Sequence, residues 1–152
     1  MIVKAEDRQF KADTARRILE DLPEWFGIES AREQYIRNTA DEVMFVSDGK
    51  DGPEGFLCLK ETGRDTAEIS VMGVRKECQG QRIGTQLFEA AYRYAKETGY
   101  SFLQVKTVKS GCYPEYDQTN CFYRSLGFKE FEIIETLWDE ANPAQIYVMH
   151  IS

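Results

Sequence analysis

Residues 66–98 constrain the fold of this chain more than any other part of its sequence. The segment TAEISVMGV at 66–74 alternates as a strand does, with its apolar residues on one face. After a turn with two glycines, residues 84–98 follow the helical period, and Gly99 is placed to end the helix. The apolar residues that recur at this spacing are Leu87, Ala90, Ala91, Tyr94 and Ala95. The sequence therefore predicts a strand that leads through a glycine-containing turn into a long amphipathic helix.

The other segments predict a mixed sheet with helices packed against it. Segments 55–61 and 66–74 flank a Thr-Gly-Arg-Asp turn, which is a hairpin signal. The other expected strands are at 2–3, 43–46, 102–108, 131–138 and 145–151. The other expected helices are at 11–21, at about 30–39 with Ser30 as its cap, and at 119–126 with Gly127 as its left-handed cap. Strands joined both by hairpins and by helical crossovers place the chain in the α/β (α+β) class.

Composition bounds the domain number and the partners. The 152 residues show no repeat or linker, so residues 1–152 are expected to form a single domain. A formal net charge of -7 disfavours nucleic acid and anionic membranes as partners, because both need clustered positive charge. No apolar run approaches the ~20 residues that cross a bilayer, and no secretion signal is evident, so a cytoplasmic protein with reduced cysteines is expected. One histidine and no Cys-x-x-C pair argue against a metal site.

The turn between the central strand and the long helix has the features of an anion site. Gly80 and Gly84 allow close approach of a phosphate, and the first N–H groups of a helix have no intrahelical acceptor. These donors and the helix dipole favour an anion, to which Arg75 and Arg82 add charge. An ordinary strand-to-helix connection with two glycines fits the same residues. The spacing matches neither a dinucleotide-binding glycine motif nor a P-loop, so nucleotide hydrolysis is not indicated.

Two short motifs resemble the GNAT acetyltransferase superfamily. Q-G-Q-R-I-G at 79–84 is similar to the family's coenzyme A signature, Q/R-x-x-G-x-G/A, except that Arg82 replaces the middle glycine. F-Y-R-S-L-G-F at 122–128 is similar to the family's F-Y-x-x-x-G-F, and the order of elements is similar too. The resemblance implies a GNAT-type mixed, mostly antiparallel sheet of about seven strands flanked by about four helices. It also implies an N-acetyltransferase, an acyltransferase that uses acetyl-CoA as co-substrate and no metal.

The resemblance assigns the cofactor to the turn and to the strand before it. The amides of Met72 and Val74 are expected to bind the thioester carbonyl and the pantetheine arm, with Gly73 easing a bend where the strand splays from its neighbour. A regular strand with every amide paired is the alternative. The residues expected around the diphosphate are Gln79, Gly80, Gln81, Arg82, Ile83, Gly84 and Thr85.

Acetyl transfer to an amine needs a neutral amine, a stabilised oxyanion and a proton for the departing thiolate. A primary ammonium with a pKa near ~10.4 loses its proton at pH 7 at a cost of roughly 4.6 kcal/mol. The resemblance suggests Glu68 as the general base, directly or through water, although strand glutamates are usually solvated or paired, here with Lys60. It suggests Tyr123 as the general acid, although a helix tyrosine beside Phe122 is usually a packing residue.

The sequence does not identify the acceptor amine. Trp25 and Phe26, in a turn between the first two helices, and Tyr113, in the loop after 102–108, resemble positions that wall the acceptor pocket. Loop aromatics also commonly cover the edge of a core. The acceptor can be a small-molecule amine or a peptide or protein amine, and a non-catalytic acyl-CoA-binding sensor is the alternative from another class. The sequence is compatible with both a monomer and a homodimer.

Overall fold

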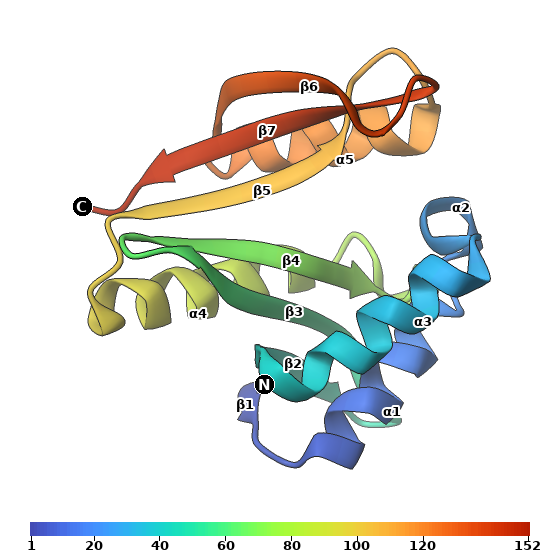
Figure 1. Ribbon diagram of the computed structural model, residues 1–152. Coiled ribbons are helices and arrows are strands. Elements are labelled where there is room, and N and C mark those ends of the chain that lie inside the picture. Colours follow the sequence, from blue (N-terminus) through green and yellow to red (C-terminus); the bar gives the residue numbers. More distant parts are fainter. The chain divides into compact units, whose positions relative to one another are not determined.

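A seven-stranded mixed sheet carries the helices of this protein, as the sequence predicted. The computed structural model describes residues 1–152 (Figure 1). The strands are β1 (Ile2–Ala5), β2 (Val43–Gly49), β3 (Gly52–Gly63), β4 (Thr66–Val74), β5 (Phe102–Val108), β6 (Lys129–Asp139) and β7 (Asn142–His150). The α-helices are α1 (Arg8–Leu19), α2 (Pro23–Phe26), α3 (Glu29–Asn38), α4 (Ile83–Thr98) and α5 (Pro114–Ser125). The strand order is β1-β2-β3-β4-β5-β7-β6, and β4 pairs with β5 in parallel.

The chain forms two compact units, and residues 1–60 with 70–94 make up the first. Its apolar core joins α1 and α3 to one face of β2, β3 and β4. The core residues of this face are Ala5, Ala15, Ile18, Leu19, Leu22, Ile36, Met44, Val46, Phe56, Cys58 and Val71. On another side of the strands, the ring of Phe45 meets Tyr94 of α4 with centroids 5.8 Å apart. Among the apolar positions predicted at strand and helix spacing, this unit buries Val71, Leu87 and Ala91, while Ala90 and Tyr94 are half-buried.

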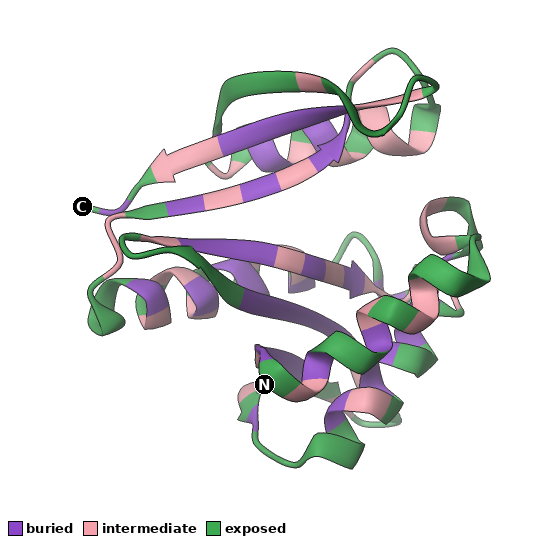
Figure 2. Cartoon of the chain, viewed as in Figure 1, coloured by how far each residue is buried: buried purple, intermediate pink, exposed green.

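Residues 61–69 and 95–152 make up the second unit. In this unit β5 pairs with Thr66–Ile69 in parallel and with β7 in an antiparallel ladder that runs from Phe102↔His150 to Val108↔Ala144. Figure 1 shows α5 lying along β5 and β7, and Figure 2 shows that β6 is exposed along nearly all of its length. Leu103, Val105 and Tyr147 supply fully or almost fully buried side chains to the core.

Three local predictions differ from the structure. The last helix begins at Pro114 rather than at 119, because proline at its first position and acidic residues in its first turn favour a helix start. Ser30 is not the cap of α3, which starts at Glu29 after Ile28. The turn expected around Trp25 belongs to the short helix α2, which starts at a proline. None of these differences changes the order of the strands.

Gly55 of β3 allows α4 to pack directly on the sheet. A Cβ atom at this position would lie 3.1 Å from Ile83 Cγ2 and 3.2 Å from Leu87 Cδ1. Because Ile83 begins α4, we expect Gly55→Ala to push the start of the helix away and to lower the free energy of unfolding by about 1–3 kcal/mol. Chemical denaturation measures this change.

Gly63 offers a matched control on the same strand. A Cβ atom there would meet only Thr66 Cβ, at 4.0 Å. We therefore expect Gly63→Ala to leave the free energy of unfolding unchanged or slightly raised. Equal losses for Gly55→Ala and Gly63→Ala would contradict the proposed contact with α4.

Candidate cofactor and catalytic site

The turn between β4 and α4 is fixed by hydrogen bonds at its start. Arg75 donates its backbone N–H to the carbonyl of Glu54 at 2.9 Å, and the Gln79 side chain donates to the carbonyl of Val74 at 3.0 Å. The amide of Lys76 donates to Asp21 Oδ2 at 2.8 Å. Gln79 and the three residues after it are exposed. The predicted diphosphate turn is therefore anchored on one side and open to solvent on the other.

Arg82 adopts the backbone conformation that a glycine would favour. Its φ is +64°, and it is the one non-glycine residue of the chain with a positive φ, while Gly80 in the same turn has a φ of +81°. The left-handed conformation costs an L-residue roughly 1–2 kcal/mol. Arg82 also accepts the first hydrogen bond of α4, from the amide of Gln86 at 3.0 Å. The turn thus keeps a left-handed residue at the position where the sequence departs from the glycine motif.

The start of α4 supplies backbone donors and charge. The N–H groups of Ile83, Gly84 and Thr85 lie in the first turn of α4, where no intrahelical acceptor exists. Nothing lies within 4 Å of a Cβ atom built on Gly80, so the space beside it is open. Arg82 is exposed at this surface. Donors, an open turn and a cation together form an anion-binding geometry.

Two other cations near the turn are held in ion pairs. Arg75 pairs with Glu77 at 3.0 Å, and Lys76 pairs with Glu24 of α2 at 2.5 Å. The pKa of the Glu24 carboxyl is lowered, mainly because Lys76 donates a hydrogen bond to it. The ion pair of Glu24 with Lys76 therefore connects α2 to the turn.

Met72, Gly73 and Val74 are the last three residues of β4. A Cβ atom on Gly73 would lie 2.9 Å from Leu22 Cδ1 and 3.1 Å from Ile18 Cγ2, so the glycine allows α1 to approach the strand closely. The structure thus gives Gly73 a packing role that the sequence did not indicate.

Glu68 is buried and paired with a residue of β5. Only 5% of it is exposed, and its Oε1 lies 2.7 Å from the Nζ atom of Lys106. Gln104 is opposite Glu68 in the parallel register, so the ion pair crosses the two strands diagonally. Lys106 was not a predicted partner, because the pairing depends on the β4–β5 register rather than on the hairpin. The ammonium holds the carboxylate in a fixed place.

Tyr123 of α5 is also buried, with 7% of its surface exposed. Its ring contacts those of Phe122, Phe128 and Tyr147, with centroids 5.7, 5.9 and 6.1 Å away. Gly127, with a φ of +105°, ends the helix in the predicted left-handed conformation. The F-Y-x-x-x-G-F segment therefore packs as one aromatic cluster around Tyr123.

The three predicted acceptor-binding aromatics differ in their surroundings. Trp25 and Phe26 are half-buried and pack against the core of the first unit, and Phe26 meets Tyr35 edge to face at 5.8 Å. Tyr113 is 38% exposed and precedes α5, where its ring meets Tyr116 at 6.0 Å. Trp25 and Phe26 therefore have a packing role, and Tyr113 presents an accessible ring.

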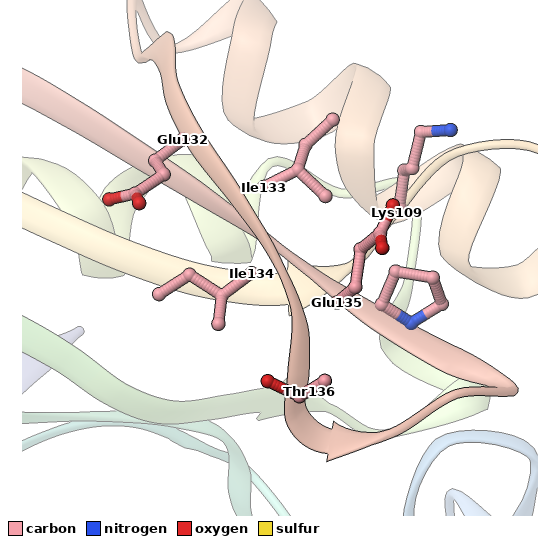
Figure 3. A pocket seen from close by; sticks show the side chains of 7 residues that line it. Lys109, Glu132, Ile133, Ile134, Glu135 and Thr136 are labelled. Atoms are coloured by element: carbon pink, nitrogen blue, oxygen red, sulfur yellow. The ribbon is translucent and has the colours of Figure 1, made fainter.

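An open cavity that the sequence did not predict lies at β6. Its volume is about 460 Å³, and its lining residues are Lys109, Glu132, Ile133, Ile134, Glu135, Thr136 and Pro143. The register between β6 and β7 shifts between Ile134 and Asp139 at this place. Figure 3 shows Ile133, Glu135 and Lys109 on one side of β6, and Glu132 and Ile134 on the other. The extra residues of β6 create the hollow, and no sequence pattern indicates such a register shift.

No helix is both long enough and apolar enough to span a lipid bilayer. No group of three or more His, Cys, Asp or Glu side chains is arranged to hold a metal ion.

The sequence comparison identifies the family. The acetyltransferase (GNAT) domain family matches residues 40–130, which include the turn, α4, β5 and the F-Y-x-x-x-G-F segment. The chain therefore belongs to the GNAT acetyltransferases and, with them, to the acyl-transferring enzymes. A comparison with curated proteins finds no match.

Solved structures show the same fold at low sequence identity. A GNAT-family protein from Desulfovibrio desulfuricans has a TM-score of 0.87 at 15% identity, with 100% of both chains covered. A ribosomal-protein alanine N-acetyltransferase from Escherichia coli has a TM-score of 0.78 at 18% identity, covering 100% of this chain and 95% of that one. An aminoglycoside 6'-N-acetyltransferase complexed with coenzyme A has a TM-score of 0.75 at 16% identity, covering 100% and 97%.

Proposed function

We propose that residues 1–152 form one N-acetyltransferase domain, which transfers the acetyl group of acetyl-CoA to a primary amine by direct attack in a ternary complex. The observation that carries the proposal is the left-handed conformation of Arg82, with a φ of +64°. A left-handed residue therefore stands where the coenzyme A signature has a glycine, the residue that adopts this conformation most readily. A backbone conformation that is unfavourable for an L-residue persists only where the surrounding structure stabilises it. Such positions cluster at functional sites.

The turn and the first turn of α4 are suited to the diphosphate of coenzyme A. Backbone N–H groups at Ile83, Gly84 and Thr85 and the positive end of the helix dipole favour the anion. Gly80 leaves room beside the backbone, and the guanidinium of Arg82 adds a charged donor. Gln79 and Gln81 are exposed beside these donors.

Three residues or groups of this chain meet the demands of amide formation. Glu68 is the base that takes a proton from the acceptor ammonium, directly or through water. The amides of Met72 and Val74 stabilise the oxyanion of the thioester carbonyl, which supplies the electrophile. The amine nitrogen forms its bond to the carbonyl carbon, the C–S bond breaks, and the phenol of Tyr123 gives its proton to the leaving thiolate. The extra proton that the amide nitrogen still carries then passes to the tyrosinate through solvent, which restores the phenol.

The acceptor is an amine of a small molecule or of a peptide. The structural relatives include an aminoglycoside 6'-N-acetyltransferase and a ribosomal-protein alanine N-acetyltransferase, so the fold serves both kinds of acceptor. Exposed Tyr113 and the cavity at β6, with Glu132 and Glu135, are surfaces of this chain that suit a cationic acceptor.

A non-catalytic acyl-CoA sensor is the second candidate, and one observation favours it: Glu68 is already ion-paired with Lys106 at 2.7 Å. Thiol release from acetyl-CoA separates the two functions, with a panel of spermidine, an aminoglycoside, an amino-acid amide and an alanine-initiated peptide. An enzyme releases thiol faster with at least one amine. Binding of acetyl-CoA without release on any amine supports the sensor, and no binding refutes both.

Two variants of Arg82 separate its backbone strain from its charge. We expect both Arg82→Gly and Arg82→Ala to weaken coenzyme A binding by about 10–100-fold, because a charged hydrogen bond contributes ~1.5–3 kcal/mol. Arg82→Gly is also expected to unfold with about 1 kcal/mol more free energy than Arg82→Ala, since glycine carries no left-handed penalty. Calorimetric titration with coenzyme A and chemical denaturation measure the two effects.

Arg64 provides the control for a general charge effect, because it is an exposed arginine between β3 and β4. Arg64→Ala is expected to leave coenzyme A affinity within about twofold of the parent. Unchanged affinity in both Arg82 variants would remove the guanidinium from the cofactor site.

A further inference from the structure

A buried polar network fixes α5 against the two strands beneath it. Asn120 is fully buried, and its Nδ2 donates to the carbonyls of Val108 at 2.8 Å and Tyr116 at 2.7 Å. Its Oδ1 accepts a hydrogen bond from the hydroxyl of Tyr147 at 2.5 Å. The amide side chain therefore joins the end of β5, its own helix and β7, and a network this fully satisfied specifies a single arrangement.

Tyr147 extends the network to the surface of α5. Its hydroxyl also accepts a hydrogen bond from Arg124 Nη1 at 3.1 Å, and the same guanidinium reaches Cys121 Sγ at 3.6 Å. The pKa of Tyr147 is raised, mainly because the phenol is buried. Its hydroxyl therefore keeps its proton and remains a donor to Asn120. Asn120 and Arg124 lie one turn apart on α5, and both are bound to the same phenol.

Tyr123 lies between the two helix residues that hold Tyr147. It follows Asn120 by three positions and immediately precedes Arg124. Its ring also contacts the ring of Tyr147 at 6.1 Å, with an interplanar angle of 51°. The rotation of α5 about its axis and the ring of Tyr147 therefore both determine where the phenol of Tyr123 points.

We infer that Asn120, Tyr147 and Arg124 form a positioning network that fixes the phenol of Tyr123 for proton donation. The inference rests on the proposed acetyltransferase function. The hydrogen bonds of the network fix the position of α5, and this helix carries Tyr123, the proposed catalytic residue. A displacement of about 1 Å at a reacting group can lower the rate about 100-fold, so a network that prevents it contributes to turnover.

Removing the hydroxyl of Tyr147 alone tests this role. Tyr147→Phe keeps the ring, and we expect it to lower kcat by about 10–100-fold with the fastest amine of the panel, while the KM for acetyl-CoA changes less than about twofold. Tyr100→Phe is the matched control: it also deletes a phenol, whose hydrogen bond to Glu61 is exposed, and its kcat is expected to stay unchanged. Arg124→Met, which leaves the hydrogen bond between Asn120 and Tyr147 in place, serves as a milder second variant with the same direction of change.

A double-mutant cycle on kcat separates positioning from general stability. If Tyr147 acts through Tyr123, Tyr147→Phe has no further effect on kcat in a Tyr123→Phe background. Equal losses in both backgrounds would overturn the inference. An unchanged kcat in Tyr123→Phe alone would instead remove the proton-donor role from the proposed function.

A readout that needs no acceptor keeps the inference testable by itself. In protein with 13C-labelled tyrosine rings, the NMR signal of Tyr123 is expected to shift and broaden in Tyr147→Phe and to stay unchanged in Tyr100→Phe. An unaltered Tyr123 signal in Tyr147→Phe would show that the network does not fix this ring, whatever the enzyme assay gives.

Discussion

Tyr123→Phe is expected to lower kcat by about 10²–10⁴-fold and to leave the affinity for acetyl-CoA unchanged. The range is that of a lost general acid, since the thiolate then leaves without a positioned proton. It corresponds to ~2.7–5.4 kcal/mol in the activation free energy. The fold is expected to survive because the phenyl ring keeps its contacts with Phe122, Phe128 and Tyr147.

The measurement combines steady-state thiol release with calorimetric titration of acetyl-CoA. Tyr100→Phe is the control, because Tyr100 lies outside the buried aromatic cluster and its hydroxyl donates an exposed hydrogen bond to Glu61. We expect the control to keep the parent kcat. A variant at Tyr123 with parental turnover would leave packing as the only role of this side chain.

The fold could be predicted wherever one segment carries its own periodic signal. The alternation of 66–74 and the helical spacing after it correspond to β4 and α4, and the segment 102–108 matches β5 residue for residue. The start of α5 was missed because PEYDQ is polar and lacks an apolar period. Its helix depends on Pro114 at the first position and on packing against the sheet.

The sequence indicated the candidate residues of the site, but it did not indicate their backbone conformation or the residues that contact them. The motif identified Arg82 as the departure from the glycine pattern, and only the backbone shows that it keeps a positive φ. The ion pair of Glu68 with Lys106 joins residues 38 positions apart through a parallel register that no local pattern specifies. The cavity at β6 likewise arises from a register shift, which depends on tertiary packing.

Glu68→Gln is expected to lower kcat/KM by about 10²–10⁴-fold at pH 7, and the loss is expected to shrink as the pH rises. At pH 7 nearly all of a primary amine carries a proton, because its pKa is near ~10.4. As the pH rises toward 10, a growing fraction of the amine is already neutral in solution. A variant without the base therefore recovers its kcat/KM toward pH 10. A carboxylate with only a structural role shows the same loss at every pH.

The ion pair with Lys106 decides how the experiment is controlled. Glu68→Gln leaves Lys106 without the charge 2.7 Å away, whereas Lys106→Met leaves a 5% exposed carboxylate without the ammonium that faces it, which costs about 3–5 kcal/mol of stability. The double variant Glu68→Gln with Lys106→Met removes both charges and keeps the packing. If Glu68 is the base, the double variant has the same pH-dependent loss of kcat/KM as Glu68→Gln. If the loss disappears in the double variant, the defect comes from the unpaired lysine, and the proton of the amine leaves by another route.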